Sequence, residues 1–133
     1  MRTIVLDTNC LIAILPSRSP FHNVWNGLLS GNIRLCVTTE ILNEYEEILH
    51  QRIPSEIAEN AIQAILNFPE LKQVDPTYFW KLIKDDPDDN KFVDCAIASN
   101  AELIVTNDAH FEVLKSIDFP KVQIASLMEF VLT

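Results

Sequence analysis

Four acidic residues stand at points of the chain where side chains are expected to gather. Asp7 and Asp108 each follow a short run of β-branched and other apolar residues, Asp89 ends an aspartate-rich loop, and Glu44 lies one turn into a predicted helix. The carboxyl ends of buried parallel strands meet at one edge of an open α/β sheet, and such sheets place their binding sites there. We therefore expect these four carboxylates to form one acidic pocket.

Carboxylates arranged in this way suit hydrolysis of a phosphodiester bond. The reaction needs an activated water, neutralisation of charge on the phosphate and stabilisation of the leaving oxygen. One or two Mg²⁺ or Mn²⁺ ions supply all three, and in two-metal sites the ions stand ~3.5–4 Å apart. Hard cations of this kind prefer oxygen ligands. Without metal, the carboxylates repel one another and some of their pKa values rise.

Several neighbouring residues receive weaker assignments. Asn9 and Thr106 lie close in sequence to Asp7 and Asp108 and are expected to support them by hydrogen bonding. Asp86 and Asp94 flank Asp89 and compete with it for the third position of the pocket. Asp94 follows Asp89 by five residues, about 140° around a helix, so the two side chains do not both point squarely into one pocket. The three histidines are expected at the surface or in packing contacts.

The order of apolar runs and helix signals predicts the elements that position these acids. Short buried strands are expected at residues 2–7, 33–37, 72–74, 103–106 and 122–124. Helices are expected at residues 9–15, from Pro20 to about Leu29, after Thr38 or Thr39, from Pro54 to before Pro69, and at 90–100, 111–114 and 127–132, with a turn or helix at 78–83. This alternation predicts an α/β fold, a three-layer α/β/α sandwich with a mainly parallel central sheet.

Composition limits the class of protein. The 133 residues suit one domain, residues 1–133, and the 48% apolar content supports a compact core. The net charge of −9 has the wrong sign for a protein that binds nucleic acid passively, so any phosphate chemistry requires bound cations. Three cysteines without CxxC spacing predict reduced, buried thiols. No segment is apolar enough for a membrane span or a signal peptide, so we expect a cytoplasmic protein.

The ordered set of motifs resembles the PIN-domain family of metal-dependent ribonucleases. Its similarity is greatest to the branch related to VapC, the toxin components of toxin–antitoxin pairs. The matching segments span nearly the entire chain: Val5–Asn9, Thr39–Glu47, Asp86–Phe92 and Val105–Asp108. The resemblance implies a PIN-like fold with Asp7, Glu44, Asp89 and Asp108 as the catalytic and metal-binding quartet. Asp89 is preferred at the third position because it immediately precedes an apolar helix face, as in the family.

The same resemblance implies substrate and partners. The substrate would be single-stranded RNA, a small antitoxin protein would restrain the activity, and the protein would form a homodimer. Such antitoxins often insert a peptide carrying an arginine near the acidic pocket, which the charge of this pocket would suit. The segment from Asn107 to Phe111 departs from the family, because it lacks the further acidic residue that members often carry after the last aspartate.

Three other interpretations remain open from the residues. A haloacid-dehalogenase-like phosphohydrolase also begins with a strand-end aspartate, but its second acid would fall at position 9, where this chain has asparagine. A receiver-like phosphoacceptor domain would need an acidic pair after the first strand and a late lysine, and neither Lys115 nor Lys121 fits clearly. A non-catalytic PIN-type binding module is the third, and the presence of all four acids argues against it.

Overall fold

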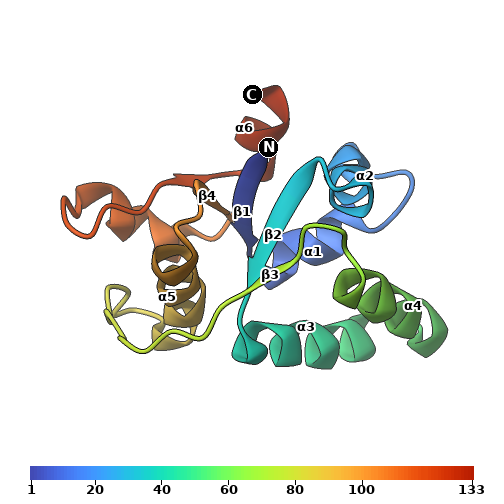
Figure 1. Ribbon diagram of the computed structural model, residues 1–133, viewed down its shortest axis with the longest axis horizontal. Coiled ribbons are helices and arrows are strands. Elements are labelled where there is room, and N and C mark those ends of the chain that lie inside the picture. Colours follow the sequence, from blue (N-terminus) through green and yellow to red (C-terminus); the bar gives the residue numbers. More distant parts are fainter.

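The computed structural model describes residues 1–133 and places a five-stranded, entirely parallel sheet at the centre of the molecule (Figure 1). The strand order is β3-β2-β1-β4-β5. The strands are β1 (Arg2–Leu6), β2 (Ile33–Val37), β3 (Lys72–Gln73), β4 (Leu103–Val105) and β5 (Ile124–Ala125). The helices are α1 (Thr8–Ile14), α2 (His22–Ser30), α3 (Thr39–Arg52), α4 (Ser55–Leu66), α5 (Asn90–Ser99) and α6 (Leu127–Leu132), with 3₁₀ segments η1 (Pro87–Asp89) and η2 (Ala109–Ser116).

Helices cover both faces of the sheet, as the predicted three-layer α/β/α sandwich requires. Helix α5 packs against β1, β2 and β4, and Figure 1 shows it on one side of the strands with α1, α2 and α4 on the other. The last three residues of β1 and of β2 are fully buried. Covered on both faces, these strands need continuous apolar runs, which is why their sequences do not alternate.

The order of the strands fixes where a binding crevice opens. From β1 the chain moves outward to β2 and β3, and then returns to place β4 on the opposite side of β1. The carboxyl ends of β1 and β4 therefore lie at the point where the direction of strand addition reverses. Leu6 pairs with Val105 at this end, and the Asp7 N–H donates to the Val105 carbonyl at 3.1 Å. Parallel sheets bind ligands in the crevice at such a point.

Helix α3 is held against the same end of β1. The Thr38 hydroxyl accepts a hydrogen bond from the Ile41 N–H and caps the helix, as its position before the apolar face predicts. One helical turn beyond that contact, the buried Tyr45 hydroxyl donates to the Leu6 carbonyl at 2.5 Å. Glu44 immediately precedes Tyr45, and Asp7 immediately follows Leu6. This bond therefore fixes the position of the Glu44 backbone relative to that of Asp7.

Two expectations about elements need correction. Residues 78–83 form no helix, because their backbone groups bond to side chains instead: Asp94 accepts from the Trp80 N–H, and the Asn90 amide bonds both the N–H and the carbonyl of Ile83. The last strand lies at Ile124–Ala125 rather than 122–124, in register with Ile104 and Val105. The sheet has no antiparallel strand.

All three cysteines are buried and unpaired. None of the helices has both the length and the apolar character needed to cross a membrane.

Candidate metal centre

Asp7 directly follows β1, at the end of the sheet where β1 and β4 lie side by side. Its side chain is buried, with Oδ2 accepting a hydrogen bond from the Thr106 hydroxyl at 2.7 Å and Oδ1 accepting from the Asn9 backbone N–H at 3.1 Å. Burial raises the pKa of Asp7 most, the two hydrogen bonds lower it, and the charges of Asp108 and Glu44 raise it further. Asp7 therefore lies within electrostatic reach of acids contributed by two other elements.

The two residues expected to support the acids do so by different means. The Thr106 hydroxyl donates to Asp7 and accepts from the Asp108 backbone N–H at 3.0 Å, so one side chain orients both acids. Asn9 holds Asp7 through its backbone only. The Asn9 side-chain oxygen instead accepts from Arg52 at 2.9 Å, which differs from the side-chain support expected from the sequence.

A cluster of four side chains lies beside Asp7. One ligand atom from each of Asp86, Asp89, Asp108 and His110 falls within 4.8 Å of all the others. His110 Nδ1 is 3.3 Å from Asp108 Oδ1 and 3.7 Å from Oδ2 of both Asp86 and Asp89. Asp108 Oδ1 also accepts from the His110 backbone N–H at 2.9 Å, a turn that brings the imidazole back over the carboxylate.

Asp89 is the least satisfied acid of the cluster. Its Oδ2 atom is buried and has no hydrogen-bond partner, although most buried polar atoms have one. Burial raises the pKa of Asp89 to about 7, with further contributions from the negative charges of Asp86, Asp108 and Asp7 and an opposing one from His110. A carboxylate oxygen aimed into a group of other acids without a donor is suited to a cation.

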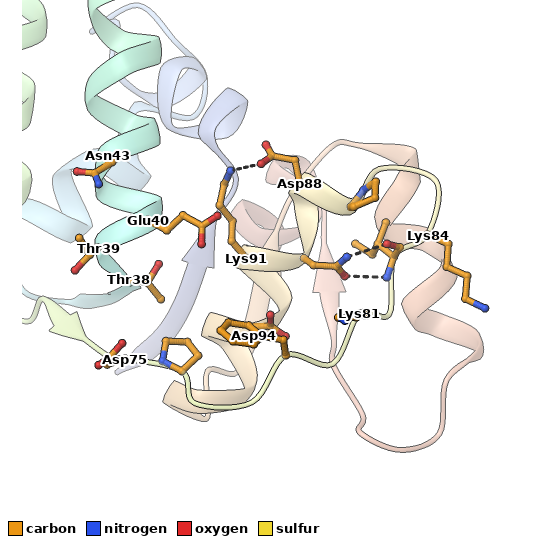
Figure 2. A pocket seen from close by; sticks show the side chains of 15 residues that line it. Thr38, Thr39, Glu40, Asn43, Asp75, Lys81, Lys84, Asp88, Lys91 and Asp94 are labelled. Carbon is orange, nitrogen blue, oxygen red and sulfur yellow. Dashed lines mark hydrogen bonds and ion pairs between the residues drawn. The ribbon is translucent and has the colours of Figure 1, made fainter.

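The structure also separates the acids that compete for the third position. Asp86 lies in the same cluster as Asp89. Asp94 lies apart, with its Oδ1 accepting from the Trp80 N–H at 3.1 Å and its side chain lining a different pocket of about 950 Å³ (Figure 2). Burial is the main reason that the pKa of Asp94 is raised. The helical rotation between Asp89 and Asp94 therefore has the consequence expected from the sequence.

Glu44 lies near Asp7 but outside the cluster, and both of its carboxylate oxygens already have partners. Its Oε2 accepts from the Thr8 hydroxyl, and its Oε1 is 2.5 Å from Lys91 Nζ. Lys91 is also 2.9 Å from Asp88 Oδ1. Burial would lower the pKa of Lys91, but its hydrogen bonds to Glu44 and Asp88 raise it above the ordinary value.

Sequence reasoning missed three residues of this region. His110 was expected at the surface or in packing, whereas Lys91 and Thr8 were given no role. For His110 a signal existed, since it lies in the segment from Asn107 to Phe111, which lacks the further acid that family members often carry after the last aspartate. Thr8 and Lys91 lie within the motif segments Val5–Asn9 and Asp86–Phe92, but their contacts with Glu44 could not be predicted, because these contacts join residues 36 and 47 positions apart.

The residues present fit a hard divalent cation. Carboxylate oxygens from three aspartates and one imidazole nitrogen lie within reach of one ion, and the unpartnered oxygen of Asp89 would gain its missing partner. Asp7 adds a further carboxylate fixed by a rigid strand end. The arrangement therefore has the ligands and the excess negative charge that a metal centre requires.

Comparisons with known proteins identify the family and the fold. A family model described as the PIN domain matches residues 3–110. Among similar solved structures, that of VapBC2 from Rickettsia felis bound to a promoter DNA fragment is 18% identical with a TM-score of 0.65, covering 93% of this chain and 98% of that one. VapBC-1 from nontypeable Haemophilus influenzae is 16% identical with a TM-score of 0.63, covering 95% and 98%.

A third similar structure is the PIN domain endonuclease Utp24, which is 17% identical with a TM-score of 0.56 and covers 93% of this chain and 84% of that one. No curated protein sequence matches the chain. At these identities, the solved structures show a shared fold.

Proposed function

Because the chain belongs to the PIN-domain family, whose members are generally metal-dependent nucleases, we propose that it is an endoribonuclease that hydrolyses phosphodiester bonds of single-stranded RNA. The observation that carries the proposal is the unpartnered, buried oxygen of Asp89 within the cluster of Asp86, Asp108 and His110, beside Asp7. We take residues 1–133 as a single domain of this kind.

The roles follow from how firmly each acid is held. Asp7, Asp89 and Asp108 would hold the ion, either Mg²⁺ or Mn²⁺, with Asp86 close enough to share the role of Asp89. Glu44 completes the catalytic quartet from α3. When bound, one or two such ions neutralise charge on the scissile phosphate and lower the pKa of a water molecule.

The chain's own residues prepare the crevice for that chemistry. Thr106 holds the Asp7 carboxylate and the Asp108 backbone in place before a cation enters. The net charge of −9 repels an RNA strand until cations reduce it. Substrate binding and catalysis should therefore both depend on the divalent ion.

We further propose that the protein is the toxin of a toxin–antitoxin pair. The motif resemblance to VapC-like toxins and the shared fold with proteins of VapBC assemblies support this role. A small antitoxin would bind the toxin near the acidic crevice, which is complementary to a basic side chain. A cytoplasmic location and a homodimer complete the proposal, by analogy with the family.

Cleavage of a labelled single-stranded RNA tests the enzymatic proposal. The purified protein would be assayed with Mn²⁺, Mg²⁺ or EDTA beside Asp7→Asn, with Asp85→Asn as a control that removes the same charge from an exposed loop position. We expect metal-dependent cutting by the wild type and by Asp85→Asn, and its loss in folded Asp7→Asn. Equal cutting by Asp7→Asn would refute the catalytic assignment. Metal binding without cutting by any form would favour the non-catalytic binding module.

A further inference from the structure

Lys91 is the only lysine that contacts an acid of the proposed quartet, and it is buried there. It stands in the first turn of α5, with only 7% of its side chain exposed. Its Nζ lies 2.5 Å from Glu44 Oε1 and 2.9 Å from Asp88 Oδ1, and Figure 2 shows the side chain directed at Asp88. A buried ammonium of this kind is retained only with close anionic partners, because desolvating it alone costs several kcal/mol.

The acids of the proposed site fall into two groups, which differ in the side chains that already contact them. On one side, Asp89 has an oxygen without a partner, next to Asp86, Asp108 and His110. On the other side, both oxygens of Glu44 are taken, one by the Thr8 hydroxyl and one by Lys91. No lysine or arginine contacts the carboxylates of Asp86, Asp89 and Asp108, and their ion-pair neighbour is His110, which carries a charge only when protonated.

We propose that the Lys91 ammonium takes the place of a second divalent cation at Glu44, so that the crevice binds a single divalent ion on the side of Asp86, Asp89 and Asp108. This inference rests on the proposed metal-dependent function and narrows it from one or two ions to one. A second ion, ~3.5–4 Å from the first, would need Glu44 as a ligand, because Glu44 is the acid of the proposed quartet that lies near Asp7 but outside the cluster. Lys91 already supplies a positive charge there.

Displacing Lys91 would be unfavourable for physical reasons. An entering ion would repel the ammonium and would leave it buried without Glu44, one of its two partners. The covalently attached lysine, in contrast, loses little translational freedom when it binds Glu44. The same residue holds Glu44 in one orientation, which makes Lys91 a positioning residue.

Counting bound Mn²⁺ ions tests the proposal without any RNA. Mn²⁺ titration of the full-length protein, followed by calorimetry and by electron paramagnetic resonance of the free ion, would compare the wild type with Lys91→Met and Lys84→Met. Lys84 is an exposed lysine on the rim of the neighbouring pocket and has no ion pair, so it controls for the loss of one positive charge.

We expect one Mn²⁺ per chain in the wild type and in Lys84→Met, and a doubling to two in Lys91→Met. Combining Lys91→Met with Glu44→Gln should return the count to one, because the carboxylate that receives the second ion is gone. Two ions in the wild type, or one in folded Lys91→Met, would overturn the proposal. A wild-type count of two overturns the proposal even if the variants fail to fold.

The Mn²⁺ count and the RNA cleavage assay test the two proposals separately. A count that doubles in Lys91→Met while no form cuts RNA would support the role of Lys91 and refute the ribonuclease. If the wild type cuts RNA and binds two Mn²⁺ ions, the result would support the ribonuclease and refute the role of Lys91. If no form of the protein, the wild type included, binds Mn²⁺, both proposals fail.

Discussion

Asp89→Asn should stabilise the metal-free protein at neutral and alkaline pH, although it removes a proposed metal ligand. The folded protein holds the Asp89 carboxyl at a pKa of about 7, against an ordinary value of 3.8, because burial and neighbouring acids oppose its ionisation. The folded state therefore binds this proton more tightly than the unfolded state does. Stability from this group is greatest near pH 4 and is lost as the pH rises to about 7.

The size of the effect follows from the same pKa difference. At 1.36 kcal/mol for each pKa unit, full ionisation of Asp89 costs the folded state up to about 4 kcal/mol. The side chain is 14% exposed, so solvent relieves part of this cost. Asp89 caps no N–H of α5, but its charge near the helix start contributes up to about 1 kcal/mol that asparagine loses. We expect a net gain of roughly 2–3 kcal/mol at pH 8.

Urea denaturation followed by circular dichroism measures this gain. The wild type, Asp89→Asn and the exposed control Asp85→Asn would be compared in EDTA between pH 4 and pH 8. The advantage of Asp89→Asn should shrink toward pH 4, and Asp85→Asn should track the wild type. Adding Mn²⁺ at pH 8 should stabilise the wild type and leave Asp89→Asn nearly unchanged. A variant no more stable than the wild type at pH 8, or a gain independent of pH, would refute the reasoning.

Three further predictions concern neighbouring contacts. In the RNA cleavage assay Asp89→Asn should lose activity and Asp94→Asn should retain it, since Asp94 bonds Trp80 outside the cluster; the reverse ranking would show that the third acid is misassigned. Thr106→Val should weaken Mn²⁺ binding by roughly 10–100-fold in calorimetry, and an unchanged affinity would show that the hydroxyl does not orient Asp7. Tyr45→Phe should cost about 1–3 kcal/mol in urea denaturation, because it leaves the buried Leu6 carbonyl without its donor; no loss would contradict that contact.

Much of the framework follows from local signals in the sequence. Short apolar runs ending in Asp7 and before Asp108 predict buried parallel strands with acids at their carboxyl ends, and the strands form where expected. The Thr38 cap and the periodic apolar face after it predict α3 with Glu44 in its second turn. These predictions succeed because strand and helix patterns depend on residues close together in the chain.

The partners of each acid depend on contacts that no local pattern encodes. Lys91 meets Glu44 across 47 residues of chain, and Asp89 reaches Asp108 only because β4 returns to the side of β1. Residues 78–83 form no helix because side chains of Asp94 and Asn90 bond their backbone from a later helix. The sequence by itself determined which acids stand at strand and helix ends. The tertiary structure alone decided which of them lack a partner and which already hold a lysine, because burial and distance between remote elements set the charge that each carboxylate experiences.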